Sequence, residues 1–130
     1  MILAFLISTS ILFTTDSSST QVHTDFDIAL RSADSNLNLQ GGEQYDDDFG
    51  RSCGPWLANE MVKCTAGLDS LNLKAFTFLF RVGSSGNIEE MVVRPNTKVA
   101  ECLKSSFKIH SYPKPPSGSW WVKVNISTTE

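Results

Sequence analysis

Three short apolar segments in the last third of the chain are typical of strands, and in the first and last of them apolar and polar residues alternate with a period of two. The segments are 74–82, 88–94 and 119–127. A glycine-containing turn at 84–87 joins the first two segments, and a proline-rich loop at 112–118 leads into the third. The sequence therefore predicts three short antiparallel strands.

The alternation also predicts which face of each strand is covered. The face expected in the core carries Phe76, Phe78, Phe80 and Val82 on the first strand and Trp120, Val122, Val124 and Ile126 on the last. The opposite face mixes Leu79 with polar residues such as Arg81 and Lys123, so we expect it to be solvated. In the middle strand 91–93 is apolar on both faces, which leaves its register open.

Two segments show the period of amphipathic helices. The first opens at Gly54-Pro55, because proline is tolerated at the first helical position, and Gly67 is a natural stop. The second covers 96–110, with Asn96 as the expected N-cap. Their apolar stripes are Leu57, Met61 and Cys64 in the first helix, and Val99, Cys102, Leu103 and Phe107 in the second. We predict an α+β fold over residues 52–127, a three-stranded antiparallel sheet with two helices packed on one face.

The first 51 residues have a different composition. An apolar run at 2–13 is shorter than the roughly 20 residues that span a bilayer, and we interpret 1–20 as a secretory signal segment. A buried N-terminal strand or an uncleaved anchor are the alternatives. Residues 21–51 contain Gly41-Gly42 and the acidic run at 46–48, with little apolar periodicity, and we predict a flexible acidic, Gly/Ser-type spacer there. The aspartates at 46–48 lack the spacing of a calcium-binding loop.

Composition narrows the function classes. The 130 residues have room for one ordinary domain, and the formal net charge is −3. The basic residues are dispersed, so no nucleic-acid surface is predicted. No G-x-S-x-G or H-E-x-x-H motif occurs, and His23 and His110 lie far apart in the sequence. We expect no catalytic residues, no metal site and no cofactor.

The three cysteines, at positions 53, 64 and 102, bear on the compartment. Each predicted helix has one cysteine on the face that should meet the sheet. In an oxidising compartment a Cys64–Cys102 disulfide would join the two helices and, by the loop-entropy model, stabilise the fold by roughly 4 kcal/mol. Pairing of Cys53 with Cys64 is the competing arrangement, and three buried free thiols are the remaining one.

The order of these features resembles the C-terminal domain of TonB-type energy transducers. The shared features are a cysteine before the first strand, a glycine turn, a helix with a central cysteine, an aromatic-Pro-x-Pro loop and a closing strand. In this sequence Cys64, Gly86, Cys102 and the loop Tyr112-Pro113-Lys114-Pro115 occupy those places. The resemblance covers about 52–127. Tyr112 stands where the family usually has Phe, and the long proline-rich spacer of the family is missing.

What the resemblance implies is a periplasmic or secreted module that binds an envelope protein or an extended peptide at an exposed strand edge. We expect the last strand to be that edge, with the 112–118 loop beside it. The candidate partner-binding residues are Tyr112, Pro113, Pro115, Trp120, Trp121 and Lys123. Pairing of two chains through their strand edges is a further expectation. The alternative function is a small secreted, disulfide-containing inhibitor or immunity-type protein.

Overall fold

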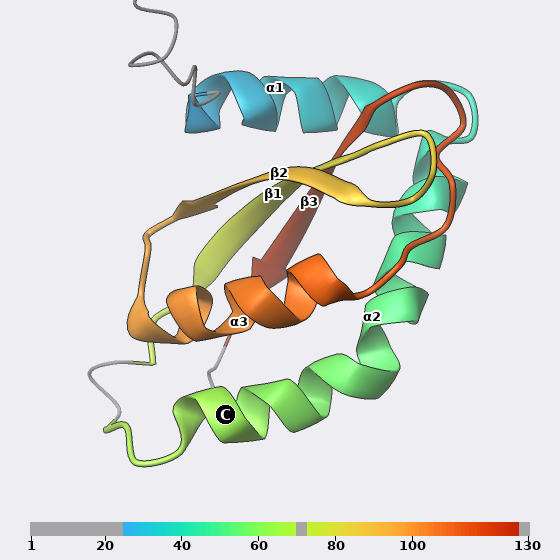
Figure 1. Cartoon of the computed structure of the whole chain (residues 1–130). Helices are drawn as coiled ribbons and strands as arrows, with labels where there is room; N and C mark the ends of the chain where they lie inside the picture. Colours follow the sequence, from blue (N-terminus) through green and yellow to red (C-terminus); the bar gives the residue numbers. More distant parts are fainter. Residues whose placement is uncertain (1–24, 70–72, 128–130) are drawn as a thin grey trace, which may run out of the picture.

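The computed structural model describes residues 25–69 and 73–127. In chain order its elements are α1 (Phe26–Leu37), α2 (Gly42–Thr65), β1 (Phe76–Val82), β2 (Ile88–Arg94), α3 (Lys98–Ile109) and β3 (Trp120–Ile126). Figure 1 shows α1 on one face of the sheet and α3, flanked by α2, on the other. The predicted α+β class and its three-stranded antiparallel sheet are confirmed, with one helix more than expected.

The strand order is β2-β1-β3, so β1 is the central strand and pairs antiparallel with both neighbours. Phe80 lies opposite Met91 on β2 and Val122 on β3, which sets the register that the sequence left open. Beyond Arg81 the register with β2 shifts by one residue, so that Glu89 forms a bulge. Within the residues that the structure describes, both β2 and β3 are edge strands of the sheet.

The main core lies between the sheet and the pair α2 and α3. Phe78 and Phe80 of β1, Phe49 of α2 and Phe107 of α3 are fully buried. The rings of Phe80 and Phe107 are 4.5 Å apart, and Phe49 stacks on Tyr112 at 4.5 Å. The predicted apolar face of β1 is therefore in the core, because alternate residues of a strand share one face.

The opposite face of the sheet is covered by α1, which corrects the expectation that it is solvated. Leu79 is fully buried there against Ala29 and Ala33, with Val92 and Trp121 packed around them. The small side chains of α1 let the helix approach the sheet closely while leaving little apolar signal in the sequence. Arg94 adds an ion pair to Asp27 at 2.9 Å beside this cluster.

The predicted flexible spacer at 21–51 is wrong for residues 26–37 and 42–51, which are helical. Tyr45, Phe49 and Cys53 recur every four residues and are buried, so α2 begins at Gly42 and not near Pro55. The aspartates lie on the solvent side of this helix, where Asp47 pairs with Arg51 at 3.0 Å. A run of charges marked an exposed helical face rather than a linker.

Pro55 lies inside α2 and not at its first position. An interior proline removes one backbone hydrogen bond and crowds the preceding turn, which bends a helix. Figure 1 shows α2 as a bent helix that follows the core from one end to the other. The part after the bend runs beside α3.

The start of α3 also differs by one residue from the prediction. Thr97, not Asn96, is the N-cap, and its hydroxyl accepts the amide hydrogen of Ala100 at 3.1 Å.

The turn between β1 and β2 contains Gly86, which has φ +91° and whose carbonyl accepts the amide hydrogen of Tyr112 at 3.0 Å. A side chain at position 86 would collide with the Tyr112 carbonyl. Glycine is therefore required where the β1–β2 turn meets the loop.

The disulfide is the expected one: Cys64 of α2 and Cys102 of α3 are bonded, with their Cα atoms 5.7 Å apart. Cys53 is a buried free thiol, so the competing Cys53–Cys64 pairing does not form.

Within residues 25–69 and 73–127 no helix is long and apolar enough to cross a membrane. The predicted signal segment at 1–20 lies outside the described residues.

Candidate binding edge along β3

The outer side of β3 presents main-chain groups that β1 does not use. The Trp121 carbonyl lies 3.5 Å from the side-chain amide of Asn36 on α1, so it points away from β1. Main-chain groups of successive residues in an antiparallel strand point to alternate sides. Trp121, Lys123 and Asn125 therefore direct their N–H and C=O groups outward, and the residues between them pair with β1.

A cavity of about 140 Å³ lies beside this edge. It is bounded by Trp120–Lys123 and Asn125 of β3, by the C-terminal half of α1 and by the start of α2. The side chains at the helical walls are Ala33, Asp34, Leu37 and Asp46. The outward groups of β3 are thus bordered by a hollow with both apolar and acidic walls.

The charges in this hollow are arranged around Lys123. Its ammonium group pairs with the Asp34 carboxylate at 3.0 Å. Partial burial raises the pKa of Asp46 above its ordinary value, while the positive charge of Lys123 acts in the opposite direction. The cavity therefore contains one lysine between two carboxylates, and it offers more acceptors than donors to a ligand.

The two tryptophans predicted as partner-binding residues, Trp120 and Trp121, both pack against the body of the protein. Trp120 is buried in the main core, where its ring stacks at 6.1 Å on Tyr45. Trp121 is partly buried beneath α1 in the second cluster, with the Arg81 guanidinium 6.0 Å from its ring. Both indoles serve packing first, and the main chain of β3, not the aromatic rings, is what the edge exposes.

The proline loop is likewise held by the core. The Tyr112 side chain is buried, and its hydroxyl donates to the Phe107 carbonyl at 2.6 Å. The Pro113 carbonyl accepts the hydroxyl hydrogen of Tyr45 at 2.7 Å, and Pro115 is partly buried. Burial raises the pKa of both tyrosines, that of Tyr45 to about 12. The loop therefore connects α3 to β3 with Tyr112 anchored in the core, and its exposed positions are 114 and 116–118.

Two residues that the sequence analysis missed complete the edge, Asp34 and Asn36 of α1. Each makes one contact to β3, the first to the Lys123 side chain and the second to the Trp121 carbonyl. Both lie within residues 21–51, where the sequence predicted a flexible spacer and no helix. Both contacts join segments more than 80 positions apart in the chain, and such pairing leaves no local signal.

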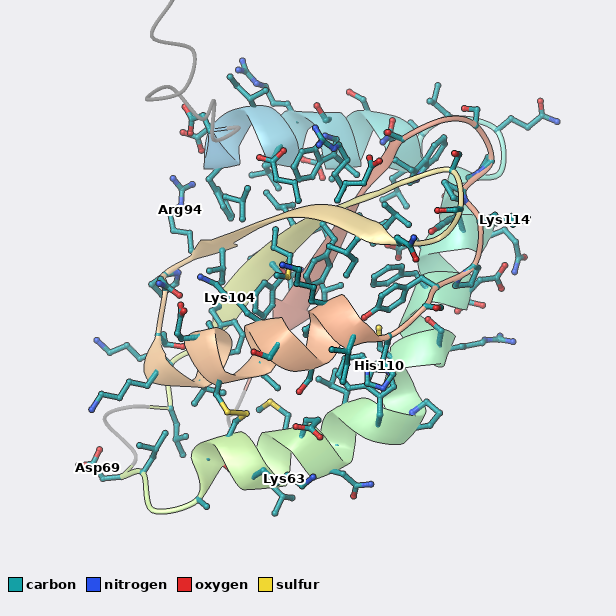
Figure 2. All side chains as sticks on the ribbon, viewed as in Figure 1. Lys63, Asp69, Arg94, Lys104, His110 and Lys114 are labelled. Carbon is teal, nitrogen blue, oxygen red and sulfur yellow. A yellow bond between two sulfur atoms is a disulfide. The ribbon has the colours of Figure 1, made fainter. Side chains whose placement is uncertain are left out.

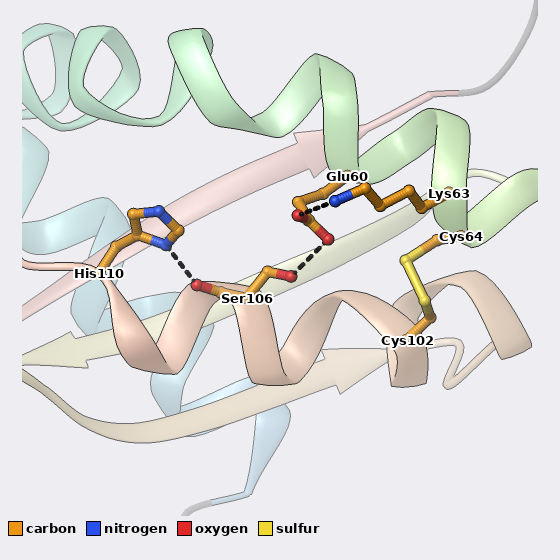
Figure 3. Close-up of polar contacts among 6 residues, drawn as sticks. All are labelled: Glu60, Lys63, Cys64, Cys102, Ser106 and His110. Carbon is orange, nitrogen blue, oxygen red and sulfur yellow. Dashed lines mark hydrogen bonds and ion pairs between the residues drawn. A yellow bond between two sulfur atoms is a disulfide. The ribbon is translucent and has the colours of Figure 1, made fainter.

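A polar cluster between α2 and α3 places Glu60, Ser106 and His110 together (Figure 3). The Ser106 hydroxyl donates to the Glu60 carboxylate at 2.9 Å, which holds the pKa of that carboxyl below its ordinary value. The His110 Nδ1 lies 2.6 Å from the Ser106 carbonyl oxygen. Because a carbonyl can only accept, this ring nitrogen carries the proton.

The cluster does not form a nucleophile–base pair. The Ser106 hydroxyl hydrogen is directed to a carboxylate, and the imidazole contacts the main chain and stacks on Trp56 at 4.1 Å. A serine nucleophile needs its hydroxyl bonded to the base that will take its proton. The arrangement fits a polar link between the two helices, one helical turn from the Cys64–Cys102 bond.

Metal binding and thiol chemistry depend on particular groupings of side chains. Across residues 25–69 and 73–127, no group of three or more His, Cys, Asp or Glu side chains is placed to hold a metal ion. The Cys53 thiol is enclosed in the core, and burial raises its pKa to about 11.

Comparison of the chain with protein-family models, with curated proteins and with solved structures gives no match in any of the three.

Proposed function

We propose that this chain is an exported, non-catalytic binding module that takes an extended segment of an envelope protein as an added strand beside β3. The observation that carries the proposal is that β3 is an edge strand whose outward main-chain groups border a cavity. An added strand gains affinity from main-chain hydrogen bonds and specificity from the walls its side chains meet. The TonB-like order of elements in the sequence points the same way.

The walls of the cavity define what the added strand should carry. Side chains directed toward α1 and α2 would meet Leu37, Asp34 and Asp46. We expect an apolar residue and a hydrogen-bond donor at alternate positions of the ligand. The hollow between β3, the C-terminal half of α1 and the start of α2 should also restrict the ligand's register, because the ligand's side chains have to fit its walls.

The contacts of α1 with β3 would be part of binding. Asn36 occupies the first outward carbonyl, at Trp121, and leaves the groups of Lys123 and Asn125 for a ligand. A ligand that pairs along the whole strand has to displace this amide. Because a single such hydrogen bond contributes about 1 kcal/mol net, displacement is a modest cost.

Export is proposed from the disulfide together with the N-terminal sequence. Cys64–Cys102 is the kind of bond that persists in oxidising compartments, and the apolar run at 2–13 is typical of a secretory signal. Both the periplasm and the extracellular medium are oxidising enough to maintain this disulfide. The absence of catalysis is proposed because the Ser106–His110 geometry does not activate the serine.

The sharpest test replaces an outward amide by proline. Lys123→Pro removes an N–H that faces away from β1, and edge strands tolerate proline where the N–H is unpaired. Lys123→Ala is the matched control, since it removes the ion pair to Asp34 but keeps the N–H. We expect the proline variant to fold and to lose capture of a partner from an envelope extract, and the alanine variant to retain it.

The outcomes separate the functions. Equal capture by the wild type and by a folded Lys123→Pro variant would place binding elsewhere. If the proline variant does not fold, hydrogen exchange on the wild-type complex decides instead: strand addition protects the amides of Lys123 and Asn125, and their unchanged exchange contradicts it. A captured enzyme whose activity is blocked would favour the inhibitor class.

A further inference from the structure

The second edge of the sheet, at β2, also borders a hollow. A cavity of about 200 Å³ lies between β2 and α3, and its lining defines the β2–α3 groove: Ile88, Glu89, Glu90, Met91, Lys104 and Lys108. The strand order leaves the outer side of β2 without a strand partner in the part of the chain that the structure describes. This groove is on the opposite edge from β3 and shares no residue with its cavity.

The register tells which main-chain groups β2 exposes. Arg81 lies opposite Trp121, whose groups point away from β1, so the groups of Arg81 point toward β2. Glu90 lies opposite Arg81 and pairs with it, and alternation then directs the N–H and C=O of Met91 and Val93 outward. The Gly83 amide, which has the same orientation as Arg81, donates to the Asn87 carbonyl at 2.8 Å.

The floor of the groove is apolar. Met91 lies opposite Phe80 and Ile88 opposite Val82, so both side chains point to the face that α3 covers. Both are partly buried against the main core and partly open to the groove. Methionine adapts its shape to different partners, which suits a binding surface.

The wall of the groove carries positive charge. Lys104 and Lys108 lie four residues apart on α3, hence on one side of the helix. Figure 2 shows Lys104 in the space between α3 and β2. Its ion pair with Glu101, at 2.8 Å, is a surface pair of low net stability, and Lys108 has no ion pair among the described residues.

The two glutamates of the groove are held by Arg81, whose guanidinium lies 3.2 Å from the Glu90 carboxylate and 3.4 Å from that of Glu89 and offsets one of their two charges. The Ser119 hydroxyl also donates to Glu89 at 3.0 Å. Arg81 lies on the α1 side of the sheet, so its ion pairs draw both carboxylates toward that side, whereas Lys104 and Lys108 belong to the α3 wall of the groove.

We propose that the β2–α3 groove binds an extended acidic segment of a partner protein, which adds to the edge of β2 with its carboxylates facing Lys104 and Lys108. One helical turn separates the two lysines by about 6 Å along the helix axis. Alternate residues of an added strand are about 6.8 Å apart on one face. The spacing therefore matches acidic residues at positions i and i+2, with the strand's main chain paired to Met91 and Val93.

The probe for the test is a blocked seven-residue peptide that alternates threonine with glutamate, compared with the same peptide carrying glutamine. NMR titration of the full chain reads the amide shifts. We expect the glutamate peptide to shift the Met91 and Val93 amides and to bind at least tenfold more tightly than the glutamine peptide, with affinity falling as salt is raised. No shift at millimolar glutamate peptide, or equal binding of the two peptides, would overturn the proposal.

The variant test removes the two groove lysines together. Lys104→Gln with Lys108→Gln should weaken the glutamate peptide at least tenfold. The control, Lys63→Gln with Lys98→Gln, makes the same change of charge outside the groove and should leave affinity within twofold. An equal loss of affinity in both double variants would show that only the net charge of the protein matters, and would overturn the proposal.

A second copy of the chain is the other possible occupant of the β2 edge, and sedimentation of the free chain tests for it. A dimer in which the Met91 and Val93 amides are protected would assign the edge to a second copy and overturn the proposal.

Discussion

The side-chain amide of Asn36 lies 3.5 Å from the main-chain carbonyl of Trp121, across 85 positions of sequence. This contact ties α1 to the edge strand β3 and identifies which main-chain groups of β3 face outward. It also occupies one of the groups that an added strand would use. The helix that covers one face of the sheet is thereby linked to the proposed binding edge.

If this contact competes with a ligand, Asn36→Ala should tighten binding at β3. Removal of one net hydrogen bond of about 1 kcal/mol corresponds to a gain of up to about fivefold in affinity. Isothermal titration with the captured segment measures it. Asn38→Ala is the control, because Asn38 donates only within α1, to the Asp34 carbonyl at 3.0 Å. Weaker binding by Asn36→Ala would show that the amide supports the site instead.

The disulfide between Cys64 and Cys102 should stabilise the fold through its loop, since the cysteines are 38 positions apart. Replacing both by serine is expected to lower the free energy of unfolding by about 4 kcal/mol, as measured in urea. Cys53→Ala, which leaves the disulfide intact, should retain most of the stability. Equal unfolding curves for the oxidised and reduced wild type would contradict this expectation.

The buried thiol and phenol predict a loss of stability in alkali. The folded-state pKa values, about 11 for Cys53 and about 12 for Tyr45, lie above the ordinary values of 9.0 and 10.0, chiefly because burial disfavours the charged forms. Their neutral forms therefore stabilise the fold fully below pH 9, and this contribution is lost as pH rises through 11 and 12. Urea unfolding at pH 8, 10 and 11.5 should show the decline.

A Cys53→Ala variant tests the assignment of that decline. It should flatten the fall in stability between pH 9 and 11, and the fall above pH 11 should remain because Tyr45 is unchanged. Mass analysis after each measurement verifies that the disulfide is intact. A pH dependence identical to that of the wild type would mean that the thiol does not contribute.

The Ser106–Glu60 hydrogen bond predicts an opposite dependence in acid. The folded-state pKa of Glu60 is lowered, first by the Ser106 hydroxyl and then by Lys63, so the stabilisation is present above the ordinary glutamate pKa and is lost as pH falls. Ser106→Ala should lower the melting temperature at pH 7 and differ less from the wild type at pH 3. Ser105→Ala, at the exposed neighbouring position, is the control. A difference that persists unchanged at pH 3 would assign the loss to packing.

The sheet was predictable because its information is local. Phe76, Phe78 and Phe80 alternate with shorter or polar residues, and a strand with that pattern has to cover one face. The stripes of the last two helices, and the cysteines within them, likewise predicted a bond between α2 and α3. For the strands and the helix stripes, the spacing of apolar residues along one element was sufficient.

The site was less predictable, and Trp121 shows why. On the strand it belongs to the mixed face, which is solvated only if nothing covers it, and the covering element is a helix whose buried residues are Ala29 and Ala33. Alanines carry little hydrophobic signal, although they pack closely. Tyr112 is likewise buried, and its hydroxyl donates to the Phe107 carbonyl of α3, a contact that the sequence of the loop does not reveal.

The sequence by itself determined the strands and the apolar stripes of the later helices, because period and spacing along the chain are sufficient for these, and it favoured Cys64–Cys102 over the competing Cys53–Cys64 pairing. Only the tertiary structure decided that α1 covers the second face, that β1 is central and that β2 and β3 are both edges. Strand order and the approach of distant helices depend on contacts between segments far apart in the chain. The free edges, where binding is proposed, are set by those contacts.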